Sequence, residues 1–171
     1  MSASEAVALS VEGMSCASCV GRVERALSTL PGLSDVSVNL AAETVRFRAD
    51  RPERIAEAAR ALDSLGYPAR SRTVTLAVEG MSCASCVDRV DRALAAAPGV
   101  RETSVNLAAE TATVTYLEGA LSDADLIRAS AAAGYPARLA ETGGARDREA
   151  RKAEEGRALA RRTAFAALFA V

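Results

Sequence analysis

Residues 11–20 read VEGMSCASCV, and residues 78–87 repeat the same ten letters. All the cysteines of the chain lie in these two stretches and form two pairs with the same spacing: Cys16 with Cys19, and Cys83 with Cys86. The chain of 171 residues has no histidine, and its 21 Lys and Arg residues nearly balance 22 Asp and Glu residues. The repeat therefore predicts two equivalent sites whose chemistry comes from thiols.

The repeat extends beyond the cysteines and predicts two tandem domains. VNLAAET recurs 67 residues along the chain, at 38–44 and 105–111, and GYPAR recurs at 66–70 and 134–138. A unit of this length exceeds a solenoid repeat and suits a small domain with its own core. We therefore predict a first domain at 5–72, a second domain at 73–140 and a tail at 141–171.

Each copy shows the same order of hydrophobic patterns. In the first copy, Val7, Leu9 and Val11 alternate with other residues as in a half-buried strand, and a helical stripe follows the cysteine loop. Two more alternating runs, a second helical stripe and a short strand near 67–72 complete the copy. This order predicts an α+β unit with a four-stranded antiparallel sheet and both helices on one face.

Thiol pairs without histidine favour a soft metal ion. Thiolates select Cu(I), zinc and iron–sulfur clusters, but structural zinc and the common clusters take four protein ligands. Each copy supplies two, and the pairs stand at the same place in equivalent units, so we predict one Cu(I) per domain. Zn(II) is a weaker alternative. A dithiol redox pair is a rival, although the residues between the cysteines, Ala-Ser in both copies, lack the aromatic or proline typical of a reactive disulfide.

The residues around the cysteines are expected to support the two sites. They comprise a glycine, a methionine and a serine in each copy: Gly13, Met14, Ser18, Gly80, Met81 and Ser85. The glycines let the loop leave the strand, and the methionines fit the core better than the metal. The serines are predicted to cap the following helix, with Asp88 completing a capping-box-like pair, which places the second cysteine at the positive end of a helix dipole. Ser122 and Asp125 predict a capping box for a later helix.

The motif GMSCASC, on a βαββαβ pattern of this length, resembles the heavy-metal-associated domain with its GMxCxxC loop. The resemblance covers about residues 5–140 and implies a ferredoxin-like fold with a Cu(I) site at each cysteine pair. Tyr67 and Tyr135 stand where the domains of copper ATPases usually carry an aromatic residue. Ser15 and Ser82 stand where zinc and cadmium exporters often carry a carboxylate, which favours copper.

The resemblance implies the N-terminal metal-delivery or regulatory arm of a copper-transporting P-type ATPase, on the cytosolic face of a membrane. A freestanding tandem copper chaperone is the alternative. The 171 residues contain no DKTG or CPC motif and no catalytic constellation, so any ATP hydrolysis would belong to a longer parent protein. Expected partners are the remaining ATPase domains and a cytosolic copper chaperone. The net charge of −1 gives no sign of nucleic-acid binding.

Charge and hydropathy add two expectations. Residues 73–140 hold five basic and eight acidic residues, against nine of each in residues 1–72. With Asp88 and Asp91 after its cysteines, the second domain is predicted to be the better dock for a basic chaperone. The tail ends in the apolar run Ala164–Val171, which follows two arginines and resembles the start of a membrane helix; an amphipathic helix packed on a domain is the alternative.

Overall fold

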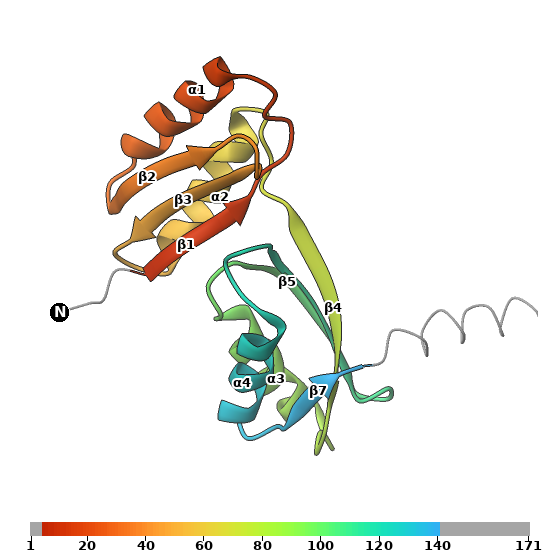
Figure 1. Cartoon of the computed structure of the whole chain (residues 1–171). Helices are drawn as coiled ribbons and strands as arrows, with labels where there is room; N and C mark the ends of the chain where they lie inside the picture. Colours follow the sequence, from red (N-terminus) through yellow and green to blue (C-terminus); the bar gives the residue numbers. More distant parts are fainter. Residues whose placement is uncertain (1–4, 141–171) are drawn as a thin grey trace, which may run out of the picture. The chain divides into compact units, whose positions relative to one another are not determined.

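A computed structural model describes residues 5–140. Its helices and strands, shown in Figure 1, are β1 (Glu5–Ser10), α1 (Ala17–Ser28), β2 (Leu33–Asn39), β3 (Thr44–Ala49), α2 (Glu53–Ser64), β4 (Ser71–Val78), α3 (Ala84–Ala95), β5 (Val100–Asn106), β6 (Thr111–Leu117), α4 (Asp123–Ala132) and β7 (Ala137–Leu139). The described residues as far as Leu139 belong to one compact unit. The order of elements confirms the predicted α+β class with two copies of the same ferredoxin-like arrangement.

The first domain is built on a sheet with the strand order β1-β3-β2. Antiparallel pairing sets Val7 opposite Phe47 and Leu9 opposite Val45, so alternate residues of the two strands point to one face. These four side chains are at most 4% exposed and share one core with residues of α1 and α2. Both helices therefore cover the same face, and each fully buried side chain contributes about 1.5–3 kcal/mol.

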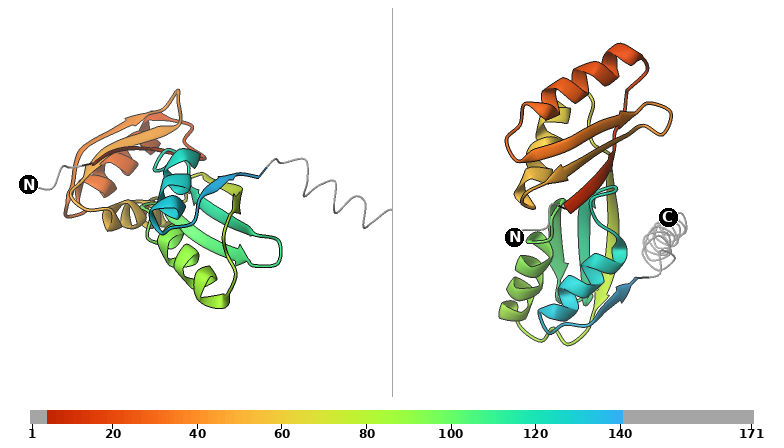
Figure 2. Two further views of the ribbon diagram at one scale, coloured as in Figure 1. Left: turned by 90° about the horizontal axis from the view of Figure 1, so that it is seen from below. Right: turned by 60° about the vertical axis from the view of Figure 1, so that its left-hand side comes forward.

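The second domain has a four-stranded sheet with the order β5-β6-β4-β7. Figure 2 shows α3 and α4 side by side over one face of this sheet. On that face, Leu76 of β4 lies opposite Ala112 of β6, and both are fully buried. Tyr116 is also buried, and its hydroxyl donates a 2.5 Å hydrogen bond to Asp123 at the start of α4. This bond gives the polar end of a core tyrosine the partner that it needs.

The first domain differs from the prediction at its last strand. A fourth strand is expected near 67–72, but the structure forms only a single bridge there, between Val11 and Ala69. Ser71 already begins β4, which pairs with β6 and β7 in the second sheet. Because no linker separates the domains, the residues that would lengthen the strand are taken up by the second domain.

The helices that carry the cysteines begin earlier than predicted. Cys16 and Cys83 are the N-caps of α1 and α3, both in an extended conformation, and no side chain caps either helix. The prediction that Ser18 and Ser85 cap these helices, with Asp88 completing a box, is therefore wrong. Because each helix starts directly after the first cysteine, the serines lie within the first turn.

The predicted capping box of α4 is confirmed. Ser122 is the N-cap of this helix, and its backbone N–H donates to a carboxylate oxygen of Asp125 at 2.9 Å. The Ser122 hydroxyl donates to the same oxygen at 2.6 Å. These bonds define the start of a helix whose apolar face is otherwise weak.

The predicted tail at 141–171, with its apolar end Ala164–Val171, lies outside the described residues. Within residues 5–140, no helix has the length and apolar character needed to span a membrane.

Candidate metal centre

Each cysteine loop leaves the end of the first strand of its domain and is held there by backbone hydrogen bonds. The N–H of Val11 donates to the carbonyl of Glu43 at 2.8 Å, and the N–H of Glu12 donates to the carbonyl of Pro68 at 3.0 Å. The second domain repeats both bonds, at 2.8 and 2.9 Å, with the equivalent residues. The repeated VNLAAET and GYPAR stretches thus supply the acceptors that hold the loops, a role that periodicity in the sequence does not reveal.

Gly13 and Met14 carry the first loop from the strand to the helix. Gly13 has a φ of +84°, which favours glycine, and a Cβ added there would lie 3.9 Å from Cδ1 of Tyr67. Met14 is 4% exposed and belongs to the core, as predicted. Gly80 and Met81 repeat the positive φ and the burial, at +82° and 5% exposure, although a Cβ added to Gly80 would meet nothing within 4 Å.

The two thiols of each pair lie together at the start of the helix. The sulfur atoms of Cys16 and Cys19 are 2.9 Å apart, and those of Cys83 and Cys86 are 2.8 Å apart. All four cysteines are free; the first of each pair is exposed and the second is half-buried. The first cysteine is therefore open to an incoming ligand, while the second is anchored in the helical turn.

Hydrogen bonding makes the second thiol of each pair unusually acidic. The pKa of Cys19 falls from its ordinary value of 9.0 to about 6, first because of the Cys16 side chain, then because of the Tyr67 side chain and a backbone hydrogen bond at Ser15. The pKa of Cys86 is also lowered to about 6, by the equivalent partners in the same order. These thiols are therefore largely ionised at neutral pH, and the thiolate is the form that binds metals.

Tyr67 and Tyr135 approach the second cysteine of their domains. The pKa of Tyr67 is raised, first by its hydrogen bond with Cys19, and the pKa of Tyr135 is raised in the same way by Cys86. A raised pKa keeps the phenol protonated at neutral pH, so each hydroxyl is available as a donor toward the neighbouring sulfur. The structure thus brings together the two residue types that the sequence separates by about fifty positions.

The loop serines contact the first cysteine. The hydroxyl of Ser18 lies 2.9 Å from the sulfur of Cys16, and that of Ser85 lies 3.1 Å from the sulfur of Cys83. Both serines are exposed. They therefore orient the outer thiol of each pair, which is a different role from the predicted helix cap.

The two sulfurs are the ligands that each domain offers. Among the described residues, no group of three or more Cys, His, Asp or Glu side chains could hold a metal ion together. A metal bound to two sulfurs at about 2.3 Å in a tetrahedral arrangement needs them about 3.8 Å apart, and a linear arrangement needs more. The thiols must therefore separate when they bind an ion, and the first cysteine is the more exposed of the two.

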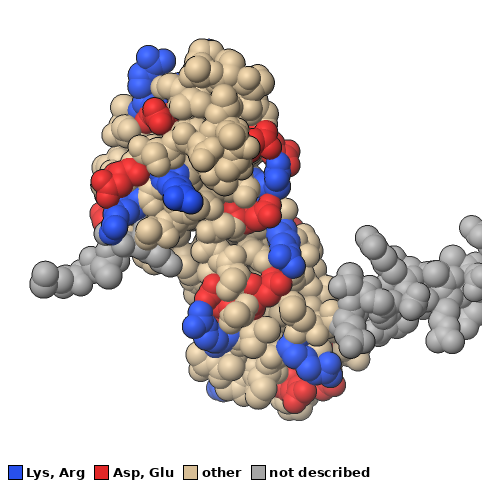
Figure 3. Space-filling model, viewed as in Figure 1, with Lys and Arg blue, Asp and Glu red and all other residues tan. Residues whose placement is uncertain are grey.

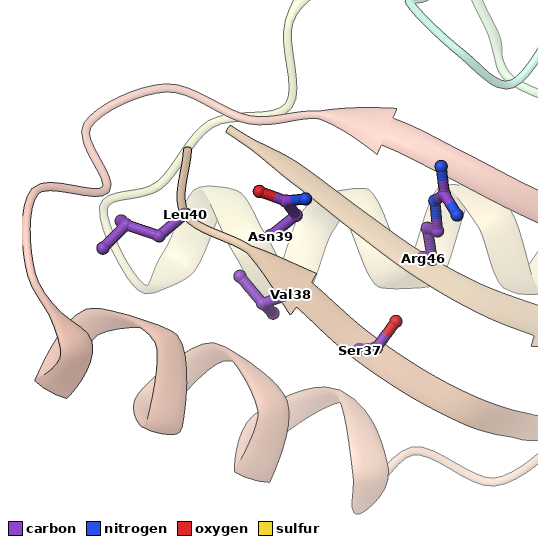
Figure 4. Close-up of a pocket in the computed structure, with 5 residues that line it drawn as sticks. All are labelled: Ser37, Val38, Asn39, Leu40 and Arg46. Carbon is purple, nitrogen blue, oxygen red and sulfur yellow. The ribbon is translucent and has the colours of Figure 1, made fainter. Parts of the chain in front are cut away.

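A pocket on the first domain offers no such chemistry. Its volume is about 410 Å³, and Ser37, Val38, Asn39, Leu40 and Arg46 line it (Figure 4). These residues come from β2, β3 and the turn between them. With neither a thiol nor a carboxylate in its lining, this pocket is no candidate for metal binding or acid–base catalysis.

Charged side chains of both signs are interspersed over the face drawn in Figure 3. Near the second cysteine loop, Asp88 is exposed, whereas the Asp91 carboxylate accepts a hydrogen bond from Thr103. In the first domain, Glu24 similarly accepts the N–H of Val38 at 3.2 Å. Of the two acidic residues singled out by the sequence, Asp88 is thus the one whose carboxylate faces solvent freely enough to meet a partner.

Fold and site together define a protein with two ferredoxin-like domains, each with a paired-thiol loop. The profile of the family described as "Heavy-metal-associated domain" matches residues 8–68 and 75–136. The chain belongs to this family, as the resemblance of its loops predicts. Both matched ranges fall inside the predicted domains at 5–72 and 73–140.

Relatives and solved structures agree with this assignment. The chain is 45% identical over 150 residues to "Copper-transporting ATPase 2" of Rhizobium meliloti, covering 85% of this chain and 18% of the relative. It is 37% identical over 164 residues to the "Copper-exporting P-type ATPase" of Bacillus subtilis, covering 94% of this chain and 20% of that one. The solved water-soluble region of the P-type ATPase CopA from Bacillus subtilis matches with a TM-score of 0.57 and 37% identity, over 81% of this chain and 93% of that one. The chain therefore spans about a fifth of the length of these curated relatives.

Proposed function

We propose that each domain binds one Cu(I) ion between its two cysteines, and that the chain is the N-terminal metal-delivery or regulatory arm of a copper-transporting P-type ATPase. The observation that carries this proposal is the pairing of two thiols within 3 Å, at 2.9 and 2.8 Å, on equivalent loops. Two soft ligands suit Cu(I), whereas a structural zinc site takes four. Zn(II) binds the same pairs more weakly in this proposal.

The geometry supports transfer of the ion by ligand exchange. Cys16 is exposed and Cys19 is half-buried and acidic, so the exposed thiol can release or capture the ion while the inner thiolate retains it. Each incoming cysteine of a donor bonds to the ion before an outgoing cysteine leaves. Because the ion always keeps at least two sulfur ligands, it is never released into water.

The proposed donor is a cytosolic copper chaperone with a basic docking surface. The second domain carries a net charge of −3 over residues 73–140 (five basic against eight acidic residues), and the exposed Asp88 stands next to its site. Electrostatic complementarity of this kind raises association rates and selects partners. The chain would lie on the cytosolic side of the membrane that holds the parent protein, and the parent protein would perform ATP hydrolysis and transport.

Competition for Cu(I) with bicinchoninate, under reducing conditions, tests the metal stoichiometry. The intact chain should bind two Cu(I), and Cys16→Ser/Cys19→Ser should bind one. The matched variant Cys83→Ser/Cys86→Ser should also bind one, and Ser15→Ala/Ser82→Ala should keep both. One ion bound by the intact chain and none by either cysteine variant would show a single four-sulfur site instead.

The redox alternative has its own observation, since sulfurs 2.9 Å apart can form a disulfide without large movement. An assay for thiol–disulfide exchange distinguishes the redox function from metal binding. A redox module should reduce a disulfide substrate in the absence of metal, becoming a Cys–Cys disulfide itself, and should lose this activity when Cu(I) is bound. Absence of that exchange, together with binding of two Cu(I), supports the metal-binding function.

A further inference from the structure

Beside the cysteine loop, the first domain does not itself supply partners for all the backbone groups of its sheet edge. The N–H of Arg70 donates to the carbonyl of Ser10 at 2.7 Å, as two neighbouring antiparallel strands would do. In the second domain, the equivalent residues Ala77 and Arg138 are direct partners in the β4–β7 ladder. In the first domain, the remaining groups of the pair, the Ser10 N–H and the Arg70 carbonyl, do not bond to each other.

Glu118, which follows β6, occupies this gap. Its carbonyl accepts the N–H of Ser10 at 3.1 Å, and its own N–H donates to the carbonyl of Arg70 at 2.9 Å. One residue of the second domain, Glu118, thus satisfies both groups that the short fourth strand leaves open. Backbone groups removed from water need such partners, because an unpaired one costs as much as a lost hydrogen bond.

The residues on either side of Glu118 also contact the first domain. Leu117 is 1% exposed and belongs to the buried core of the first domain, and Ala120 packs against the same core. An ion pair at 3.2 Å joins Arg101 of β5 to Asp63 of α2. We call residues 117–120 the bridging segment.

Gly119 is the position where this contact leaves least space. A Cβ added there would lie 1.8 Å from the carbonyl oxygen of Ala8, which is backbone and has little freedom to move. Gly119 also has a φ of +92°. Gly134 provides a matched comparison, because it has a φ of +93° but would meet nothing within 4 Å.

We infer that the bridging segment of the second domain completes the sheet edge of the first domain next to its cysteine loop, and so couples the two domains. Ser10 and Arg70 directly flank Val11 and Ala69, which form the bridge at the base of the loop. The dependence runs in one direction at this edge. The second domain has its own β7 to pair with β4, whereas the first domain uses the backbone N–H and carbonyl of Glu118 from its neighbour. This inference does not rest on the proposed metal.

Hydrogen exchange of the metal-free full chain, followed by NMR, tests the coupling. In Gly119→Ala, the Ser10 amide should exchange at least about tenfold faster, as expected when a protecting contact opens locally. Shifts should spread to Ala8, Leu9 and the first cysteine loop, while the signals of the second cysteine loop stay in place. Gly134→Ala, which carries the same backbone strain without the clash, should leave the Ser10 amide unchanged.

Unchanged exchange at Ser10 in Gly119→Ala would overturn the inference, and so would an equal effect in Gly134→Ala. If Gly119→Ala unfolds the second domain, Leu117→Ala gives an independent reading. The truncated side chain should then shift methyl signals in the core of the first domain, at Val7 and Leu9. Shifts confined to the second domain would show that Leu117 does not pack across, and would also overturn the inference.

Discussion

Gly21 and Asp88 occupy the same position in their two domains, two residues after the second cysteine and on the first turns of α1 and α3. The neighbouring acidic positions, Glu24 and Asp91, carry the same charge in both helices and are held by hydrogen bonds. The extra negative charge beside the second site therefore comes from Asp88 alone.

Substitutions at Gly21 and Asp88 should alter the preference of a basic copper chaperone for one domain over the other. Asp88→Gly should weaken docking to the second domain by about two- to fivefold, the effect expected of one exposed charge pair. Gly21→Asp should strengthen docking to the first domain by a similar factor. NMR titration, with the shifts of both cysteine loops followed separately, measures the two effects.

The preference of a basic chaperone for the second domain should also weaken as salt is added, because exposed charges are screened over about 8 Å at physiological ionic strength. Glu102→Gln removes a negative charge from β5 of the second domain instead of from its cysteine helix and serves as the control. An equal loss in Glu102→Gln and Asp88→Gly would show that net charge, rather than the position of Asp88, decides docking.

Reactivity of the thiols should depend on pH in a range set by their lowered pKa. In the metal-free chain, alkylation of Cys19 and Cys86 by iodoacetamide should reach half its maximum rate near pH 6, instead of near 9.0. Since the pKa is lower in the folded state, the thiolates stabilise the fold above pH 9, and this contribution declines as the pH falls to about 6. Mass spectrometry of the labelled cysteines gives both midpoints.

Removal of the Tyr67 hydroxyl should raise the pH midpoint of alkylation at Cys19 and leave that of Cys86 unchanged. Tyr67→Phe should move the Cys19 midpoint upward but keep it below 9.0, because the larger contribution from Cys16 remains. Tyr116→Phe is the control, since this buried hydroxyl bonds to Asp123 and not to a thiol. A Cys19 midpoint that is the same in Tyr67→Phe and in the unmodified chain would show that the phenol has no effect on the thiol.

The capping box of α4 should contribute measurably to stability. Ser122→Ala should lower the free energy of unfolding by about 1 kcal/mol, because it removes a cap from a helix with a weak apolar face. Urea denaturation followed by circular dichroism measures the change. Ser64→Ala, which removes an exposed hydroxyl bonded to a carbonyl at the end of α2, should cost clearly less.

The same box predicts a pH dependence. Hydrogen bonds, first from the Ser122 side chain, lower the pKa of Asp125 from 3.8 to about 2. The ionised carboxylate therefore stabilises the fold fully above pH 3.8, and this stabilisation is lost as the pH falls to about 2. Ser122→Ala should flatten that acid limb of the stability curve, and an unchanged limb would contradict the assignment.

Two glycines of the first domain should respond in opposite directions to substitution by alanine. Gly13→Ala should destabilise the metal-free chain by about 1–2 kcal/mol, because an L-residue is strained at its φ of +84°. Gly21→Ala should stabilise it by about 0.5–1 kcal/mol, because Gly21 lies within α1 with nothing within 4 Å of an added Cβ. Thermal unfolding of both variants checks the signs, and a loss of stability in Gly21→Ala would show that the position is not free.

Much of this protein can be predicted from local patterns. The alternation of Val7, Leu9 and Val11 predicts β1 and the face that it buries, and the repeat predicts the second domain from the first. The position of Ser122 before Asp125 is enough to predict the capping box. The spacing of the cysteines suffices to predict two thiols at the start of a helix. Apart from the repeat, the interacting groups in these cases lie within one turn or one strand, so a short stretch of sequence is enough to predict them.

The tertiary structure decided the features that join distant parts of the chain. Tyr67 reaches Cys19 only because the end of α2 returns to the cysteine loop, and Glu118 bonds to Ser10 across more than one hundred positions. The shortening of the fourth strand of the first domain likewise follows from competition between two sheets for the same residues. Periodicity reports which face of an element is buried, but it carries no information about which backbone groups of another element will be near enough to bond. Those pairings are settled only when the packed cores bring the segments together.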